Sequence, residues 1–347
     1  MSLSLKIGMI YLIIVFILLG FVALYFGAKL IIISLENIAY RLGVSHLLVG
    51  LTVLSIGTSL PEIAVSIMGG LDKLYGIDPN VDSIIIGNKI GSFLIQITLI
   101  LGILGLTQSV YVSKWVLIRE GFMLFISVFI FLLFALDGTI SRIDALIMMA
   151  IYFLYLLLII KSERKIEKTK LETQTIEEKR LDPQSFEAVD KRFEKLSTKK
   201  DVGIFLIGLF ILIIGAELTI LSAHTLGREL GIPENVIGIL IVGLGTSLPE
   251  LMTDLTALRR RSHGLAVGDI LGSNICDILL ATGAGAIIID FRVEPILIMF
   301  DIPMLFIAIS IAYIFLWTEK TLKKWEAAFL IGFFGFYVLL KLLFFQI

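Results

Sequence analysis

The chain has 347 residues, of which 58% are hydrophobic and 17% are charged, and its formal net charge is −1. A water-soluble protein of this length could not bury so much apolar surface, so the composition indicates an integral membrane protein whose partner is the lipid bilayer. The single cysteine, Cys276, excludes an intrachain disulfide, and we expect no nucleic-acid partner.

Apolar segments of roughly 20 residues can cross a bilayer as helices. The sequence predicts ten of them, at 7–38, 46–70, 83–108, 114–136, 141–161, 201–229, 233–258, 264–290, 293–317 and 324–346. The polar segment 162–200 between the fifth and sixth holds 11 of the 29 Lys and Arg residues and is predicted to be a linker. The fold class is therefore an all-α polytopic membrane protein, with five helices in 1–161 and five in 201–347.

Lys and Arg residues in short loops indicate which face of the protein is cytoplasmic. The loops after the first, third, seventh and ninth helices carry nine such residues, and the opposite face carries six, one of which is Lys341. We predict that the more basic face is cytoplasmic, together with the linker. Both termini would then lie outside, and we expect the protein in the plasma membrane.

The hexapeptide Gly-Thr-Ser-Leu-Pro-Glu occurs twice, at Gly57–Glu62 and Gly245–Glu250. A gapless alignment of 27–62 with 215–250 gives 14 identities in 36 positions, and 86–92 matches 267–273. The order of Gly, Thr, Ser, Pro and Glu is hard to obtain by chance, so the chain is an internal duplication. Because each repeat has an odd number of helices, the second copy enters the membrane from the opposite side, and the shared motifs meet near the midplane.

Each hexapeptide places a carboxylate inside an apolar segment, which is costly and indicates a functional site. Proline lacks an N–H group, so Pro61 and Pro249 free the carbonyl groups of Gly57 and Gly245. The motifs also supply the hydroxyl groups of Thr58, Ser59, Thr246 and Ser247. Hard oxygen ligands without His or Cys suit calcium, sodium or magnesium. The simpler interpretation, two proline kinks, leaves the two buried glutamates unexplained.

The helices at 83–108 and 264–290 add further polar side chains to these motifs. Ser273 and Asp277 are four residues apart and share a helix face, with Asn274 beside it. The equivalent residues of the first half are Ser92, Phe93 and Gln96. If Glu62, Glu250 and Asp277 are all ionised, the site needs bound cations to be stable.

The two motifs, the Gly-Ser-Asn segment and the inverted ten-helix duplication resemble the cation/calcium exchanger superfamily, especially its sodium/calcium exchanger branch. The resemblance implies antiport of calcium against sodium by alternating access, in which the first and sixth helices slide across the other eight. It implies no cofactor other than the transported ions. It also implies cation ligands at Glu62, Glu250, Thr58, Ser59, Thr246, Ser247, Ser92, Ser273, Asp277, Gln96 and Asn274, with carbonyl ligands at Ser55 and Gly243. Of these, Glu62, Glu250, Thr58 and Thr246 would hold calcium.

Two charged residues depart from the duplicated pattern. Lys89 stands where the second half has Ile270, and Asp254 stands where the first half has Ser66. In one interpretation Lys89 extends to the membrane interface and Asp254 faces a vestibule, or the two form a pair. In the other, the Lys89 ammonium replaces one bound cation and reduces the dependence on sodium.

Three other functions remain as alternatives. In a proton-coupled calcium or cation exchanger, protonation of Glu62 or Glu250 would replace sodium. An intramembrane hydrolase is disfavoured by the many Thr, Ser and Asn oxygens and by the mirrored duplication. A passive channel is disfavoured because discrete carboxylate ligands suit occlusion of an ion. We therefore expect a secondary transporter, with no enzyme activity.

Overall fold

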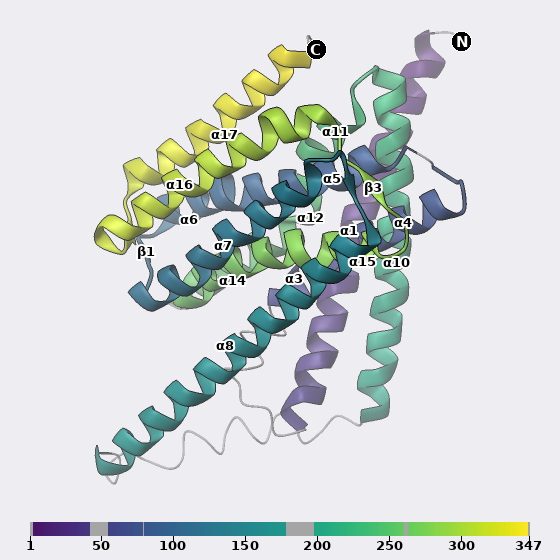
Figure 1. The fold of residues 1–347 in the computed structure, drawn as a ribbon. Coiled ribbons are helices and arrows are strands. Elements are labelled where there is room, and N and C mark those ends of the chain that lie inside the picture. The colour runs from purple at the N-terminus through teal and green to yellow at the C-terminus, as the bar shows by residue number, and fades with distance from the viewer. Residues whose placement is uncertain (1–2, 42–54, 79, 178–197, 260–262, 346–347) are drawn as a thin grey trace.

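The computed structural model describes residues 3–41, 55–78, 80–177, 198–259 and 263–345 (Figure 1). The first half contains α1 (Leu3–Arg41), α3 (Ser55–Thr58), α4 (Leu60–Leu74), α5 (Asp82–Leu94), the π-helical turn η2 (Ile95–Ile100), α6 (Leu101–Thr107), β1 (Val110–Tyr111), α7 (Lys114–Ala135), β2 (Thr139–Ile140) and α8 (Arg142–Glu177). The second half contains α10 (Thr198–Leu230), α11 (Glu234–Ile237), the π-helical turn η3 (Gly238–Val242), α12 (Gly243–Thr246), α13 (Leu248–Arg259), α14 (His263–Cys276), the π-helical turn η4 (Asp277–Ala281), α15 (Thr282–Ala286), β3 (Phe291–Arg292), the π-helical turn η5 (Leu297–Asp301), α16 (Ile302–Glu319), β4 (Thr321–Leu322) and α17 (Lys324–Phe345).

The predicted all-helical membrane fold is confirmed. Nine helical segments within the described residues are long and apolar enough to cross a membrane. The predicted helix at 46–70 lies partly outside the described residues, and its described part is α3 and α4. Several predicted bounds differ from the structure by a few residues, and one differs by more. Helix α8 continues past 161 to Glu177, and Phe291–Arg292, just before the ninth predicted helix, forms β3.

Two short ladders join the halves of the chain to each other. Strand β1 pairs with β4, and β2 pairs with β3, both antiparallel. Each ladder therefore combines a strand of one repeat with a strand of the other, and the ladders lie at opposite ends of the helices (Figure 1). The start of α1 and the end of α17 lie at one common end, as an even number of crossings requires. This exchange of strands is the arrangement that an inverted duplication predicts.

Helices α1 and α10 run side by side in opposite directions, at an angle to α7, α16 and α17 (Figure 1). Glycines allow this close approach. A Cβ atom added at Gly27 would lie 2.7 Å from the backbone nitrogen of Leu212, and one at Gly215 would lie 2.7 Å from that of Leu24. Because Gly27 and Gly215 are equivalent in the two repeats, each repeat supplies the same kind of contact, and small residues are typical where membrane helices pack closely.

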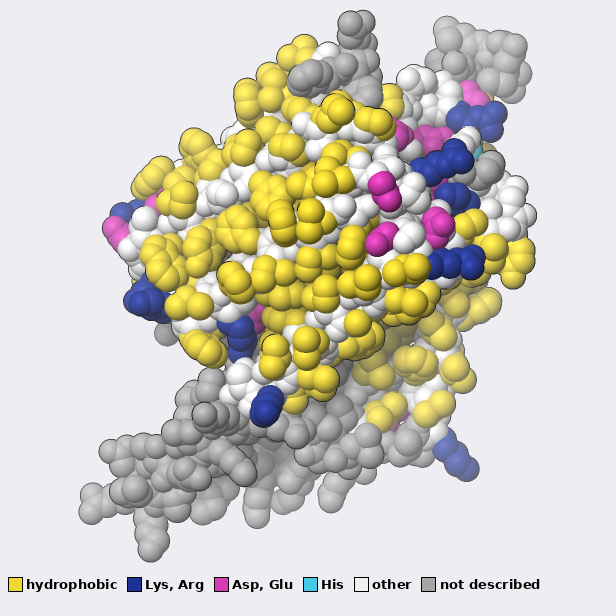
Figure 2. Space-filling view, viewed as in Figure 1, with side chains coloured by type: hydrophobic (Ala, Val, Ile, Leu, Met, Phe, Trp, Pro, Cys, Tyr) yellow, Lys and Arg dark blue, Asp and Glu magenta, His cyan; other side chains and the backbone are white. Residues whose placement is uncertain are grey.

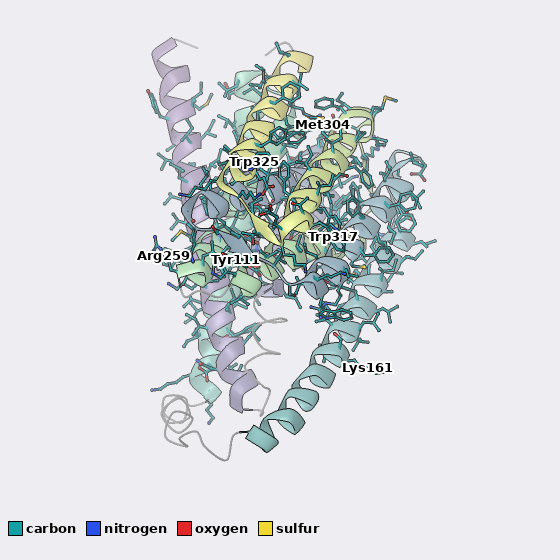
Figure 3. All side chains as sticks on the ribbon, turned by 90° about the vertical axis from the view of Figure 1, so that its left-hand side faces the viewer. Tyr111, Lys161, Arg259, Met304, Trp317 and Trp325 are labelled. Atoms are coloured by element: carbon teal, nitrogen blue, oxygen red, sulfur yellow. The ribbon has the colours of Figure 1, made fainter. Side chains whose placement is uncertain are left out.

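The outer surface suits a bilayer. Hydrophobic side chains cover the middle of the face in Figure 2, and Lys, Arg, Asp and Glu side chains gather toward its edges. Three exposed aromatic residues, Tyr111, Trp317 and Trp325, lie in or next to the elements of the β1–β4 ladder (Figure 3). Trp and Tyr at one end of a helical bundle are typical of the boundary between lipid and water.

One charge that the orientation argument assigned to a loop face is buried instead. The Lys341 Nζ atom lies 2.5 Å from Asp301 Oδ2, and both side chains are 0% exposed. The hydroxyl group of Tyr337 donates to the other oxygen of Asp301 at 2.6 Å. Lys341 therefore contributes no charge to that face, and the predicted bias toward the opposite face becomes larger. The orientation itself stays a prediction.

Candidate cation-binding site

The two hexapeptides interrupt their helices in the same way. Between α3 and α4 the break falls at Ser59, with φ −78° and ψ 2°, and between α12 and α13 it falls at Ser247, with φ −84° and ψ 3°. Both residues have φ and ψ angles in the bridge region and not in the α-helical region. The prolines of the motifs follow in the first turn of the next helix, where their missing N–H group costs no hydrogen bond.

The motif threonine of each half contacts the serine of the other half. Thr58 Oγ1 lies 3.1 Å from Ser273 Oγ, and Thr246 Oγ1 lies 3.1 Å from Ser92 Oγ. These two contacts are equivalent under the duplication. The structure therefore brings four of the six predicted hydroxyl ligands together in two mirrored pairs, each made between the repeats.

The three carboxylates of the predicted inner shell are buried, with 0% of each residue exposed. Ser92 Oγ donates to Glu62 Oε1 at 3.2 Å, and Gln96 Nε2 donates to Asp277 Oδ2 at 3.2 Å. Neither oxygen of Glu250 has a hydrogen-bond partner. The contact with Gln96 shows that the longer amide of the first half still reaches the site.

Most buried oxygens around these carboxylates lack a hydrogen-bond donor. They are Glu62 Oε2, both oxygens of Glu250, Asp277 Oδ1, Gln96 Oε1, Asn274 Oδ1, Ser59 Oγ and Ser247 Oγ. Carboxylate and amide oxygens are pure acceptors, and burying them without a donor costs free energy unless a cation compensates. The donor set therefore fits a hard cation.

Acidic groups alone do not complete a cage. Within the described residues, no three His, Cys, Asp or Glu side chains converge closely enough to hold a metal ion. Hydroxyl, amide and carbonyl oxygens must supply the remaining ligands, as is usual for calcium. The carbonyl oxygen of Gly243 lies at the site, where it accepts from Ser247 N at 3.2 Å and has Ser92 Oγ and Thr246 Oγ1 each at 3.4 Å. Ser55 begins α3, and its side chain is outside the described part.

Two π-helical turns position the amide and the third carboxylate. Gln96 is in η2, and Asp277 begins η4, at equivalent positions of the two repeats. A π-turn inserts an extra residue into a helix and is frequent at functional sites. The sequence did not predict these turns, because a local π-turn leaves the apolar pattern nearly unchanged.

Lys89 belongs to the site, and the interpretation that it extends to the interface is wrong. Its side chain is 0% exposed, and its Nζ atom donates to the backbone carbonyl of Glu62 at 2.6 Å. Asp254 is also 0% exposed, so it faces no open vestibule, and the ion pairs of the described residues include none between Lys89 and Asp254.

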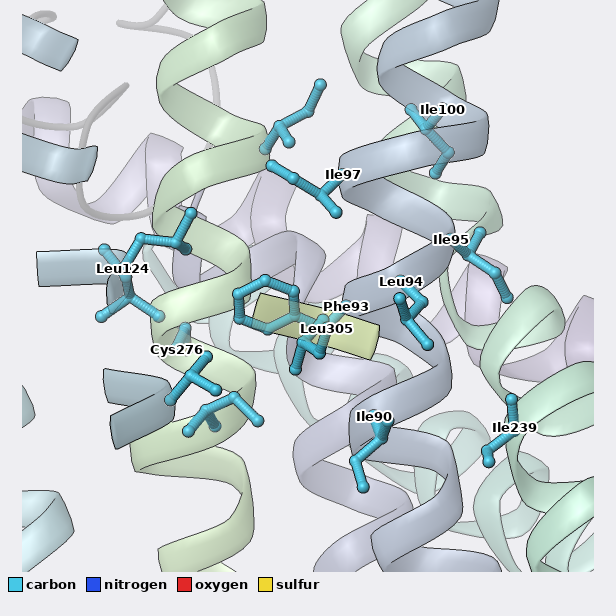
Figure 4. Packing of buried hydrophobic residues seen from close by; sticks show 14 of the residues in the cluster. Ile90, Phe93, Leu94, Ile95, Ile97, Ile100, Leu124, Ile239, Cys276 and Leu305 are labelled. Carbon is cyan, nitrogen blue, oxygen red and sulfur yellow. The ribbon is translucent and has the colours of Figure 1, made fainter. Parts of the chain in front are cut away.

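The residues that differ between the two halves of the Gly-Ser-Asn segment have separate roles. Asn274 Nδ2 donates to the carbonyl of Ile270 at 2.6 Å, which fixes the amide while its oxygen stays without a donor. Phe93 is buried in the apolar core, where its ring projects toward Leu305 and α14 (Figure 4). Phe93 therefore packs in the apolar core where the second half has the polar side chain of Asn274, and it supplies no ligand.

Two polar residues of the site were missed by the sequence reasoning. Thr246 Oγ1 donates to Asn88 Oδ1 at 3.0 Å, and Thr58 Oγ1 donates to Asp269 Oδ1 at 3.4 Å. Asn88 and Asp269 are equivalent in the match of 86–92 with 267–273. Their shared polarity inside two apolar helices was the signal that could have found them.

Comparisons with known proteins agree with this arrangement. The family model described as sodium/calcium exchanger protein matches residues 12–161 and 200–343. The chain is 30% identical to an uncharacterized membrane protein of Methanocaldococcus jannaschii, over 89% of this chain and 91% of that protein. It is 28% identical to the sodium/calcium exchanger MaX1 of Methanosarcina acetivorans, over 91% and 95% of the two chains. A solved structure of the sodium-calcium exchanger NCX_Mj, soaked with Na⁺ and Sr²⁺, superposes with a TM-score of 0.60 and 27% identity, covering 94% of this chain and 97% of that one.

Proposed function

Because the chain belongs to the sodium/calcium exchanger protein family, we propose that it is a secondary antiporter that exchanges calcium for sodium. The transport site is the cluster between the two Gly-Thr-Ser-Leu-Pro-Glu motifs. The name of MaX1, and a further structure of NCX_Mj soaked with Na⁺ and Ca²⁺, support calcium and sodium as the transported ions.

One observation carries the proposal. Three buried carboxylates, from Glu62, Glu250 and Asp277, are surrounded by mirrored hydroxyl pairs and by acceptor oxygens without donors. Such a site is costly when it is empty, because ionised carboxylates repel one another in a medium of low dielectric constant. Calcium, or sodium ions in its place, removes that cost. Exchange follows because both ions need the same carboxylates and cannot occupy them together.

Alternating access requires two parts that move against each other. The pair α1–α10 is the candidate for one part, because it crosses the remaining helices at an angle and is held together by its own glycine contacts. The mirrored motifs and the helices that contact them form the other part. The two repeats would then open the site to one side of the membrane at a time.

A second candidate is an exchanger with reduced sodium dependence. Its supporting observation is the burial of Lys89, whose ammonium contacts the Glu62 carbonyl at 2.6 Å. A fixed positive charge in the site takes the place of one sodium ion, so fewer sodium ions would accompany each calcium. The proton-coupled alternative has no such supporting contact.

Uptake of radioactive calcium into proteoliposomes, under imposed sodium, potassium or proton gradients, tests these functions. We expect uptake driven by sodium, and loss of transport in Glu62→Gln and Glu250→Gln. Glu319→Gln is the matched control, because Glu319 is exposed and pairs only with Lys323 among the ion pairs of the described residues. Transport that survives in both motif variants refutes the assignment of the transport site. Uptake driven by a proton gradient without sodium refutes sodium as the coupling ion.

A further inference from the structure

Two buried acids lie next to the central site, and their negative charges are not used by its predicted ligand set. Asp254 is in α13, four residues after Glu250, and Asp269 is in α14, four residues before Ser273. Asp254 is 0% exposed and Asp269 is 4% exposed. Four helical residues correspond to a rise of about 6 Å, so both acids are displaced by about one turn toward the end where α13 meets α14.

The two acids lie on neighbouring helices and lack donors. Helices α13 and α14 pack against each other, and each acid is one turn away from a residue of the central site. Yet neither oxygen of Asp254 has a hydrogen-bond partner, and Asp269 Oδ2 has none either. Two ionised carboxylates cannot bond to each other, because neither carries a proton. The Thr58 hydroxyl, at 3.4 Å, is a donor to the remaining oxygen of Asp269.

The duplication does not account for these two charges. The equivalent residues of the first half are Ser66 and Asn88, both neutral. Asn88 makes the same contact with Thr246 that Asp269 makes with Thr58. A neutral side chain is therefore sufficient to orient the motif threonine, and the negative charge of Asp269 needs a different reason.

We propose that Asp254, Asp269 and the Thr58 hydroxyl form a second site for a hard cation, calcium or sodium, beside the central site. The ligands are oxygens only, as such cations prefer. If all five buried carboxylates are ionised, their charge exceeds that of one calcium at the central site plus the Lys89 ammonium, and a second cation would balance the excess. This inference rests on the proposed exchange function, because it places the second ion next to the transported one.

The position of the second site suggests how it serves transport. It lies between the central motifs and the end of the bundle formed by Arg259 and His263. Thr58 connects the two sites, since its hydroxyl contacts both Ser273, at 3.1 Å, and Asp269, at 3.4 Å. An ion leaving the central site toward this end would pass from Glu250 to the acid pair one turn away. The second site thus holds an ion in transit.

Equilibrium binding of radioactive calcium and of radioactive sodium to the purified full-length protein in detergent tests the proposal. The key variant combines Asp254→Ser with Asp269→Asn, which installs the residues of the first half at both positions. We expect it to bind one cation fewer per protein than the unsubstituted chain. Whether the loss occurs in the calcium measurement or in the sodium measurement identifies the ion. Glu319→Gln should bind as many cations as the unsubstituted chain.

Three further variants keep the result interpretable. Glu250→Gln should lose transport but keep the binding that the double variant removes, which separates the second site from the central one. Asp254→Glu, which retains the charge, should keep the cation, and Asp254→Ser alone should lose it if the double variant does not fold. If the double variant binds as many calcium ions and as many sodium ions as the unsubstituted chain, the proposal is overturned. The two acids would then share a proton. Transport by Glu250→Gln would instead overturn the proposed function and leave the binding result standing.

Discussion

Replacing Lys89 by isoleucine, the residue at the equivalent position 270, removes the one lysine that contacts the central site within the described residues. Lys89 and Ser92 are three residues apart on α5, which is a rise of about 4.5 Å. A sodium ion held by the Ser92 hydroxyl would therefore lie roughly 6 Å from the ammonium. At an effective dielectric constant of about 20, two unit charges at this distance repel by about 3 kcal/mol. This repulsion corresponds to roughly a hundredfold in affinity.

We expect Lys89→Ile to bind an additional sodium ion in place of the ammonium. Uptake of calcium into proteoliposomes, measured against sodium concentration, should show a steeper dependence, with a Hill coefficient raised by about one, because one fixed charge is replaced by one ion. The sodium concentration at half-maximal effect should fall by up to about a hundredfold. Lys89→Arg keeps the charge and serves as the matched variant.

The prediction is contradicted if Lys89→Ile and Lys89→Arg both show the same dependence of calcium uptake on sodium concentration as the unsubstituted chain. In that case the ammonium would act only as a donor to the Glu62 carbonyl, at 2.6 Å, and its charge would be compensated elsewhere. Binding of radioactive calcium without sodium shows that the variants are folded.

Three other substitutions have outcomes that follow from contacts in the structure. Lys341→Met removes the cation that pairs with the buried carboxylate of Asp301. Thermal unfolding in detergent should therefore show that the free energy of unfolding falls by about 3–5 kcal/mol. An unchanged unfolding midpoint would contradict the buried pair. Gly215→Val should lower calcium uptake at least tenfold while calcium binding persists, because the new side chain meets the backbone of α1 at 2.7 Å; Gly332→Val, with nothing within 4 Å of its added Cβ, is the control. Thr246→Val removes a hydroxyl that contacts two buried polar partners, so it should raise the calcium KM about tenfold. Thr256→Val loses only an exposed hydrogen bond within its own helix and should leave the calcium KM unchanged.

Several parts of the site could be predicted from the sequence because their signals are local. Glu62 and Glu250 are identifiable as functional since an ionisable group in an apolar helix is costly wherever that helix packs. The breaks at Ser59 and Ser247 follow from a proline two residues later, whatever surrounds it. The opposite orientation of the repeats follows from counting apolar segments.

The side-chain directions could not be predicted in this way. The position of Lys89 on its helix is the same whether its ammonium reaches the interface or the Glu62 carbonyl, and only the packing of α5 against its neighbours excludes the interface. The same applies to Lys341, which pattern counting assigned to a loop face. Both side chains are long enough for either arrangement, so their sequence neighbours do not decide between the two.

What the sequence alone determined is therefore the kind of protein: a duplicated helical membrane protein with two carboxylate motifs, because helix length, apolarity and internal identity are properties of the chain itself. The tertiary structure decided which residues of the two halves meet. The contacts of Thr58 with Ser273 and of Thr246 with Ser92, both at 3.1 Å, depend on how helices from opposite repeats pack. These contacts convert two similar motifs into one asymmetric site. Its negative charges are concentrated beside the second motif, and its single lysine contacts the first.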